Sequence, residues 1–444
     1  MIISSLYIEN FKLFKEKRLN FNDRFTLIIG NNGTGKTSIL EALTVGLGGF
    51  LAGLDGVQTR NILYDEIRKE WDKPGDATIT KEPQIPVIIE CEGSIANQHL
   101  TWRRTKNSIE GKTTRSNARE LIHIAKNMQQ AIVKDKDHSV ILPVISYQSA
   151  GRLFSQKKNK WVDPFKREDM SRFIGYTDCL ESESNIKLFV NWLRRMTTIQ
   201  LQKRKKIGEL DAVLSAVEEF MKGLVEENEE VSIEYDFEEE EVMIELGKQR
   251  IPLRMMSSGY RSVIGMVADI SYRMAILNPQ LKEDAIKETP GVIIIDELDL
   301  HLHPKWQWKI VKDLKRTFPK VQFIATTHAP IIISSCSDVE IINLHDEKDY
   351  IKSTKENNPY GWQIEDTLTD IMNTYSRSPE IQKEINELEE LYSRKILGEL
   401  TKEQLEELKN KRKKLLILLP EGDPAITLAK IDAIGKLAME QVDD

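Results

Sequence analysis

The stretch FTLIIGNNGTGKTSILEAL, residues 25–43, decides how the rest of the chain is organised. Its first five residues, 25–29, are an apolar run that predicts a buried strand. An apolar pattern with helical spacing begins soon afterwards, at residues 39, 40, 43 and 47. Residues 30–37 spell G-x-x-x-x-G-K-T. Strand, glycine loop and helix in this order are the context of a P-loop, and they disfavour the alternative of a plain glycine-rich turn.

The chemistry of a phosphate chain explains these residue types. Glycines let backbone N–H groups turn inward around phosphates, and the helix N-terminus adds positive potential. Lys36 can reach the β and γ phosphates, and the Thr37 hydroxyl can bind Mg²⁺. We therefore predict a site for ATP and Mg²⁺. Its nucleotide-binding residues are Gly30, Asn31, Asn32, Gly33, Thr34, Gly35, Lys36, Thr37 and Ser38.

The composition indicates a soluble globular protein. The chain has 444 residues, 40% of them hydrophobic and 30% charged, which suggests about two or three domains. We expect no membrane segment, because no run approaches about 20 apolar residues, and the N-terminus lacks the layout of a signal peptide. Three scattered cysteines fit a reducing cytoplasm. The net charge of −7 gives no global attraction to nucleic acid, although a local basic face would leave DNA open as a partner.

Periodicity predicts the elements between the motifs. Strand-like runs occupy residues 6–11, 19–21, 83–91, 99–103, 140–146, 292–295 and 321–325, and residues 231–246 alternate as a hairpin. Helical spacing occupies residues 117–132, 263–277, 380–397, 402–418 and 425–442, and it dominates 152–230. We expect the glycine-rich residues 46–56 to loop. The chain should leave the sheet from about residue 347.

The second decisive element is GVIIIDE, residues 291–297. A buried strand brings Asp296 and Glu297 to its carboxyl end, which in a parallel sheet faces the phosphate loop. Asp296 suits a place around Mg²⁺, and Glu297 suits a catalytic base that orients the attacking water. An acidic pair at an ordinary turn is the alternative, and the preceding P-loop disfavours it.

Two further segments place polar residues at the end of a strand or the start of a helix. FIATTHAP puts His328 after a buried strand, where it could contact the γ-phosphate or the charge that develops there. MSSGYR, residues 256–261, precedes a predicted helix, and serines with a glycine at a helix start form an anion site. A structural histidine and an ordinary helix cap are the alternatives.

The order of these motifs resembles the ABC-type ATPase head of the SMC-like and OLD-like families. The resemblance implies that Gln148 is the Q-loop residue beside Mg²⁺ and that Leu298 and Asp299 begin the D-loop. It also implies that Ser257 and Gly259 belong to the signature that binds ATP. The signature departs from L-S-G-G-Q, since MSSGY stands in its place.

The same resemblance implies an α/β fold: an ABC-type P-loop ATPase head (mixed sheet with flanking helices), a helical insert and a helical C-terminal region. Residues 1–151 would form the N-terminal half of the head with P-loop and Q-loop, and 152–230 the insert. Residues 231–346 would form the half with signature, Walker B and switch histidine, and 347–444 the helical region. In such heads the signature of one chain faces the ATP of another, so we expect a head-to-head dimer or a larger homo-oligomer.

Longer segments resemble the PtuA-like ATPases of Septu and retron-linked antiphage systems. They are RFIGYTDCLESESNIKLFVNWL, GYRSVIGMVADISYRMAILNP, IIIDELDLHLHPKWQ and RSPEIQKEINELEELY. This resemblance covers most of the chain, and it implies a separate HNH nuclease, PtuB, as the partner that the ATPase regulates.

Three other functions are weaker alternatives. An SMC-like ATPase of DNA repair is the main one, but the interval between residues 148 and 257 is too short for long coiled-coil arms. A transporter ATPase is disfavoured by the late Q-loop position and the unusual signature. An OLD-type nuclease needs an acidic cluster on strands after the ATPase, where residues from 347 onward predict helices.

Overall fold

The computed structural model describes residues 1–72, 80–153, 171–181, 186–225, 230–344, 350–351 and 359–425. The chain divides into two compact units, Met1–Ile364 and Glu365–Asp444. The first unit holds the P-loop, the acidic pair and the signature stretch, and the described part of the second is helical. The sequence predicts four regions, 1–151, 152–230, 231–346 and 347–444, whereas the structure divides into two units. The division into four regions therefore remains a proposal.

The core of the first unit is a six-stranded sheet with the order β15–β14–β3–β13–β12–β8. Its strands are β3 (Phe25–Ile29), β8 (Val144–Gln148), β12 (Gly291–Ile295), β13 (Val321–Thr326), β14 (Glu340–Asn343) and β15 (Tyr350–Ile351). All neighbours pair in parallel except β14 and β15. Every residue of β3, β8, β12 and β13 is buried, as expected of a parallel sheet covered on both faces. The carboxyl ends of these strands therefore lie along one edge.

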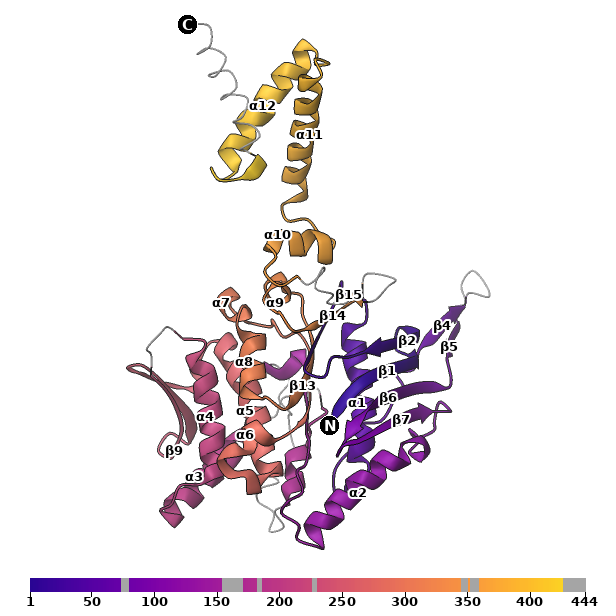
Figure 1. The fold of residues 1–444 in the computed structure, drawn as a ribbon, viewed down its shortest axis with the longest axis vertical. Coiled ribbons are helices and arrows are strands. Elements are labelled where there is room, and N and C mark those ends of the chain that lie inside the picture. Colours follow the sequence, from indigo (N-terminus) through magenta and orange to yellow (C-terminus); the bar gives the residue numbers. More distant parts are fainter. Residues whose placement is uncertain are drawn as a thin grey trace. The chain divides into compact units, whose positions relative to one another are not determined.

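A second, antiparallel sheet has the order β2–β1–β6–β7 and packs against helix α1 (Figure 1). Its strands are β1 (Ile2–Phe11), β2 (Phe14–Asn20), β6 (Val87–Ile95) and β7 (Gln98–Lys106), and a short hairpin of β4 (Lys69–Asp72) and β5 (Thr80–Pro83) precedes β6 in the chain. Helix α1 (Lys36–Leu51) contacts β6, β7 and helix α2 (Arg119–Val133). Buried and half-buried residues alternate along β6, so one face of this sheet packs on the core.

Helix α1 continues to Leu51, although we expected residues 46–56 to loop. Its glycines are points of close packing. A Cβ at Gly48 would lie 2.7 Å from the carbonyl oxygen of Arg60, and the indole N–H of Trp102 donates to the carbonyl oxygen of Gly46 at 2.9 Å. Tertiary packing of this buried helix thus outweighs the low helix propensity of glycine, and only residues 52–56 form turns.

Three strand boundaries also differ from the sequence-based expectation. The run 83–91 is divided between β5 and β6, with a cis bond between Ile85 and Pro86. Strand β8 starts at Val144 rather than at residue 140, because Pro143 has no N–H to donate to a neighbouring strand. The chain does not leave the sheet at residue 347, since β15 pairs with β14.

The helical insert contains α3 (Ile186–Lys203) and α4 (Gly208–Lys222), while residues 154–170, 182–185 and 226–229 lie outside the described part. Both helices pack on α5 (Ser258–Leu277), which follows the signature stretch. The predicted hairpin is present as β9 (Val231–Asp236) and β10 (Glu241–Leu246), and β11 (Gln249–Pro252) extends it by an unpredicted strand. Short helices are α6 (Ala285–Glu288), α7 (Pro304–Gln307), α8 (Ile310–Thr317) and α9 (Pro330–Ser334).

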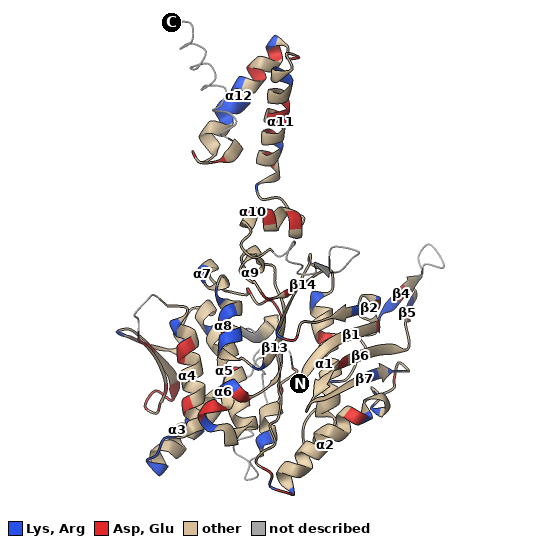
Figure 2. Cartoon of the chain, viewed as in Figure 1, with Lys and Arg blue, Asp and Glu red and all other residues tan. Residues whose placement is uncertain are grey.

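The second unit is a helical hairpin of α11 (Pro379–Ile396) and α12 (Lys402–Leu418), where the sequence predicts helices. A short helix, α10 (Ile364–Asp366), precedes them in the chain. The apolar core of the α11–α12 hairpin consists of Ile385, Leu388, Leu391, Leu408 and Leu415. Lys411 on α12 forms ion pairs with Glu384 and Glu387 on α11, two helices rich in charged residues (Figure 2). Of the helix expected over residues 425–442, all but the first residue lies outside the described part.

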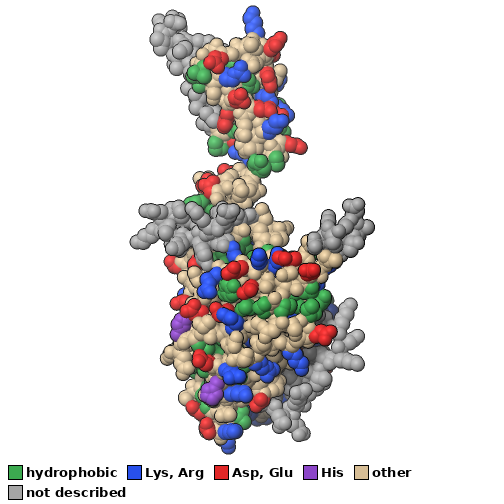
Figure 3. All heavy atoms as spheres, turned by 90° about the vertical axis from the view of Figure 1, so that its right-hand side faces the viewer, with side chains coloured by type: hydrophobic (Ala, Val, Ile, Leu, Met, Phe, Trp, Pro, Cys, Tyr) green, Lys and Arg blue, Asp and Glu red, His purple; other side chains and the backbone are tan. Residues whose placement is uncertain are grey.

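The surface of the described part carries mixed charge. On the face shown in Figure 3, acidic and basic side chains lie next to one another. This face therefore offers no extended field of one sign, in keeping with the net charge of −7. Within the described residues, no helix is both long enough and apolar enough to span a membrane.

Candidate nucleotide-binding site

The loop after β3 has the backbone shape that its sequence demands. Gly33 and Gly35 adopt φ angles of 84° and 99°, which glycine reaches at little cost. At Gly35 a side chain would also collide, since its Cβ would lie 2.5 Å from the ring of Phe14. The loop leads into the N-terminus of the 16-residue helix α1. Backbone N–H groups and the positive end of a helix therefore meet at one place, as binding of a phosphate chain requires.

Lys36 folds back over this loop. Its Nζ donates to the carbonyl oxygens of Gly30 and Asn31 at 2.8 and 3.0 Å, and the residue is only 7% exposed. Burial lowers the pKa of the Lys36 ammonium, and the nearby carboxylates of Asp296 and Glu297 oppose this shift. Because burying a cation is costly, the negative charge of a phosphate in the loop would stabilise Lys36 in this position.

Asp296 joins the loop to the ends of three strands. The Thr37 hydroxyl donates to Asp296 Oδ2 at 3.0 Å, and the Thr326 hydroxyl donates to Oδ1 at 2.7 Å. The backbone N–H of Asp296 donates to the carbonyl oxygen of Gln148 at 2.8 Å. Asp296 is 4% exposed. Hydroxyl and carboxylate oxygens are the donors that Mg²⁺ prefers, so the residues present at this point fit that ion.

Glu297 leaves the strand direction directly after Asp296. Its φ of 50° is uncommon for a residue other than glycine. The backbone N–H of Glu297 donates to the Thr326 hydroxyl at 2.8 Å, which helps to hold this conformation. Strained residues persist only where their surroundings fix them, and they gather at functional sites. The observed strain therefore supports a functional role for Glu297.

His328 follows β13, and its backbone is held by a residue of the segment that follows the neighbouring strand β12. Asp299 Oδ1 accepts hydrogen bonds from the His328 backbone N–H at 3.1 Å and from the Thr327 hydroxyl at 2.7 Å. The segment after β12 and the segment after β13 are thus tied together. This arrangement places His328 at the same edge of the sheet as Asp296 and Glu297.

Gln148 lies at the carboxyl end of β8, beside Asp296. In the strand register Gln148 is opposite Ile295, the last residue of β12. Its side-chain amide nitrogen donates to Asp269 Oδ2 on α5 at 2.7 Å and to Ser146 Oγ at 2.9 Å. The backbone of Gln148 is therefore part of the site, while its NH₂ group is directed toward α5.

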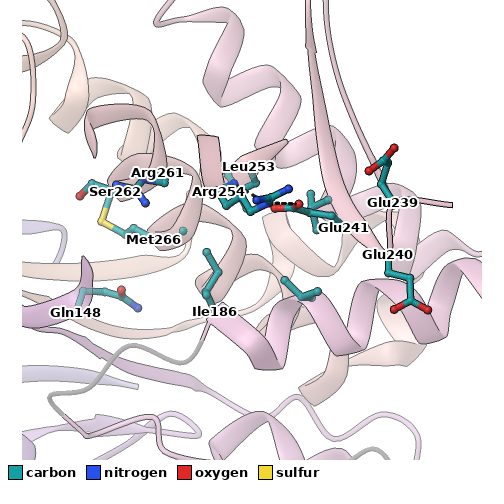
Figure 4. Close-up of a pocket in the computed structure, with 13 residues that line it drawn as sticks. Gln148, Ile186, Glu239, Glu240, Glu241, Leu253, Arg254, Arg261, Ser262 and Met266 are labelled. Atoms are coloured by element: carbon teal, nitrogen blue, oxygen red, sulfur yellow. Dashed lines mark hydrogen bonds and ion pairs between the residues drawn. The ribbon is translucent and has the colours of Figure 1, made fainter. Parts of the chain in front are cut away.

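A cavity of about 580 Å³ lies between β8, α3, α5 and the turn after β9, and Gln148 forms part of its wall. Figure 4 shows Gln148 near Ile186 and Met266, with Glu239 and Glu240 toward the other end. Arg254 and Glu241 form an ion pair along the lining. The amide of Gln148 consequently has open space beside it as well as the contact with α5.

The signature residues lie at the start of α5. Ser257 is the exposed N-cap residue of this 20-residue helix, and its side chain makes no capping hydrogen bond. Gly259 is needed for close packing, since a Cβ there would lie 2.7 Å from the carbonyl oxygen of His301. A hollow of about 520 Å³ borders Ser257 and includes Lys248 from the turn after β10 and Gln249, the first residue of β11.

The structure therefore brings most of the predicted site together. Hydrogen bonds join Thr37, Asp296, the backbone of Gln148 and, through Thr326, the backbone of Glu297. Ser257 and Gly259 are instead placed beside the segment that follows the acidic pair. The sequence reasoning missed Thr326, Thr327 and Asp269. The Thr-Thr pair before His328 is a signal for the first two, whereas nothing in the local sequence around Asp269 indicates its contact with Gln148.

These features define the class of the protein: a P-loop ATPase with an ABC-type head. A family model described as "AAA domain" matches residues 5–225, and a second AAA-domain model matches residues 188–334. Among solved structures, an SMC head bound to the C-winged helix domain of ScpA matches with a TM-score of 0.45 and 15% identity, over 77% of this chain and 94% of that chain.

Curated relatives are similar over most of the chain. The Septu protein PtuA of Bacillus thuringiensis is 26% identical over 97% of this chain and 97% of its own length. The Retron Vc95 probable ATPase of Vibrio cholerae is 26% identical over 86% of this chain and 80% of its own length. Two AAA-domain models thus match parts of this ATPase, and the chain is homologous to Septu protein PtuA and to the retron ATPases, as the resemblance in its motifs predicted.

Proposed function

We propose that this ATPase binds and hydrolyses Mg-ATP between two copies of itself, and that closure of the dimer regulates a partner HNH nuclease in antiphage defence. The observation that carries the dimer is the division of the site. The P-loop, the acidic pair and His328 lie along one edge of the sheet, whereas Ser257 stands exposed at another helix start. A second copy would complete the site.

Each residue has a role in the proposed site. Lys36 and the loop N–H groups hold the phosphates, while Thr37, Asp296 and Gln148 supply oxygen ligands for Mg²⁺. When bound, Mg²⁺ neutralises charge on the phosphate oxygens. Glu297 accepts a proton from the attacking water and orients it, and His328 donates a hydrogen bond toward the charge that develops on the γ-phosphate.

The start of α5 suits a nucleotide held by a second chain. The Ser257 hydroxyl makes no capping bond, and the first N–H groups of a helix have no partners within it. Together with the positive end of the helix they form an anion site. In a two-fold symmetric dimer the same contact would form twice, once at each ATP. Closure would then depend on bound nucleotide, and it would offer the partner protein two distinct states.

The nuclease partner is supported by the relatives. The similarity to Septu protein PtuA extends over 97% of both chains. Among the residues that the structure describes, no group of three or more His, Cys, Asp and Glu side chains is arranged to hold a metal ion. We therefore assign DNA cleavage to a partner, an HNH nuclease of the PtuB type. The proposal also includes contact between this ATPase and DNA, and it places the ATPase in the cytoplasm.

Mixing two inactive variants tests the shared site. Ser257→Arg blocks the signature, and Lys36→Ala removes the cation from the P-loop. Each should lack ATPase activity alone. Their heterodimer keeps one intact composite site, so an equimolar mixture should recover about a quarter of the wild-type rate if the two sites act independently.

The control is Leu201→Arg, which adds the same charge at an exposed position of α3. This variant should have the wild-type ATPase rate on its own, because the added arginine lies away from both composite sites. The proposal fails if Ser257→Arg alone has the wild-type rate. It also fails if the wild-type protein remains monomeric by sedimentation with saturating Mg-ATP.

A further inference from the structure

The side-chain amide of Gln148 is held by an acidic residue that lies far away in the sequence. Gln148 Nε2 donates to Asp269 Oδ2 at 2.7 Å and to Ser146 Oγ at 2.9 Å. Ser146 Oγ donates to the same Asp269 oxygen at 3.1 Å. Gln148 is 7% exposed and Ser146 is 1% exposed. The amide is therefore fixed inside the protein, beside the strand end that carries Asp296.

The carboxylate of Asp269 is itself rigidly placed. The Nε of Arg273, one helical turn further along α5, donates to Asp269 Oδ2 at 2.9 Å. Arg273 is 3% exposed, and its Nη1 donates to the carbonyl oxygens of Gly175 and Thr177 at 2.8 and 2.9 Å. Because the cation of this pair is bound to the backbone of another segment, Asp269 has little freedom to turn away from Gln148.

The chemistry of this contact selects one end of the amide. An ionised carboxylate only accepts hydrogen bonds, so Asp269 must face the NH₂ end of Gln148. The carbonyl Oε1 is then directed elsewhere, and among the described residues it receives no hydrogen bond. Only Oε1 can bind Mg²⁺, because hard cations take oxygen ligands. Adjacent strands lie about 4.8 Å apart, which keeps Gln148 close to Asp296, the residue directly after β12.

We propose that Asp269 is a positioning residue for the metal site: it holds the NH₂ end of Gln148 and thereby presents Oε1 to Mg²⁺. The inference rests on the proposed ATP site and adds a residue to it. It also links the metal side of that site to α5, the helix that begins at the signature, so a shift of α5 would change how Gln148 is presented.

The test measures binding of a fluorescent ATP, 2′/3′-methylanthraniloyl ATP, while Mg²⁺ is varied. Residues that orient a metal ligand typically contribute a factor of about 10–100 to metal affinity. Asp269→Asn replaces the carboxylate by an amide that can turn either end toward Gln148. It should raise the Mg²⁺ concentration for half-maximal binding about 10–100-fold. In a Gln148→Ala background the same substitution should change it by no more than about twofold, because the residue through which it acts is gone.

A double variant that exchanges the acid and the amide tests the same contact if Asp269→Asn alone does not fold. Gln148→Glu combined with Asp269→Asn keeps one negative charge beside Arg273 and reverses the direction of the hydrogen bond. Gln148→Glu alone places two carboxylates within hydrogen-bond distance, so they repel. The exchange variant should therefore need less Mg²⁺ than Gln148→Glu alone.

The outcomes separate this inference from the proposed function. If Lys36→Ala binds the fluorescent ATP like wild type, the nucleotide site itself is wrong. If Lys36→Ala loses binding and Gln148→Ala needs more Mg²⁺, but Asp269→Asn matches wild type, only the positioning role is overturned. An Asp269→Asn effect of equal size with and without Gln148, or an exchange variant no better than Gln148→Glu alone, overturns it as well.

Discussion

Asp296 is the residue at which distant parts of the chain meet. It accepts hydrogen bonds from the helix start after β3 and from the end of β13, and its own N–H binds the end of β8. Glu297, the next residue, has a strained backbone and stands two positions beyond the buried strand. In the proposed site this pairing separates two tasks: Asp296 would help to hold Mg²⁺, and Glu297 would act on the attacking water.

Replacing Glu297 by glutamine tests that separation. Glu297→Gln keeps the size of the side chain but cannot accept a proton. It should bind Mg-ATP with nearly wild-type affinity and hydrolyse it more slowly by about two to four orders of magnitude. Phosphate release under saturating Mg-ATP measures the rate, and fluorescent ATP measures the affinity. Asp296→Asn is the matched control, because the same chemical change one residue earlier should increase the Mg²⁺ requirement. Turnover by Glu297→Gln at the wild-type rate would show that Glu297 is not the catalytic base.

Residues whose roles follow from nearby sequence were predictable. The P-loop and the acidic pair are defined by a strand, a short motif and the order in which they occur. Thr326 was not predicted, because its contact with Asp296 depends on the register between β12 and β13, which are remote in sequence. The partner of Gln148 depends on how α5 packs against β8, and no local pattern around Asp269 carries that information.

At the scale of elements, helix α1 of the first unit shows how tertiary packing can outweigh helix propensity. Helix α1 passes through a glycine-rich stretch that the sequence alone predicts as a loop. Its glycines let the backbones of neighbouring segments approach closely. Boundaries such as the start of β8 and the existence of β11 and β15 depend on pairing partners, and periodicity did not reveal them. The central strands were predictable because each is an unbroken buried run.

The close approach in α1 makes a stability prediction. Gly48→Ala adds a methyl group whose carbon would lie 2.7 Å from the carbonyl oxygen of Arg60, a backbone atom. The chain must shift to admit it, at a cost of about 1–3 kcal/mol. We expect a thermal unfolding midpoint a few degrees lower by differential scanning fluorimetry. The matched control is Gly265→Ala in α5, where the nearest atom, Ile186 Cδ1, would be 3.6 Å away.

The control variant, Gly265→Ala, should not lower the thermal unfolding midpoint. Alanine is preferred over glycine inside a helix by about 0.5–1 kcal/mol, so Gly265→Ala should leave the midpoint unchanged or raise it. A Gly48→Ala protein as stable as wild type would show that the glycines of α1 are not required for packing.

At the scale of the whole molecule, the proposed function assigns ATP hydrolysis to this chain and DNA cleavage to a partner. The first unit holds a complete P-loop, and the described part of the second is a hairpin of two helices with an apolar core. Metal-dependent nucleases need clustered acidic or histidine ligands, and the described residues contain no group of three that could hold a metal ion. Under the proposed function, cleavage requires a second protein.

Purified chain, incubated with DNA and either Mg²⁺ or Mn²⁺, should leave the DNA intact with or without ATP. Together with the proposed partner, an HNH nuclease, cleavage should appear, and ATP should change its rate. The same complex built with Lys36→Ala should cleave at a rate that ATP does not alter, because the bound phosphate would lose its countercharge and the dimer its signal to close. The nuclease alone is the control for activity that needs no ATPase. Metal-dependent cutting by the highly purified chain, retained in Lys36→Ala, would place a nuclease site in this protein and contradict the division of labour.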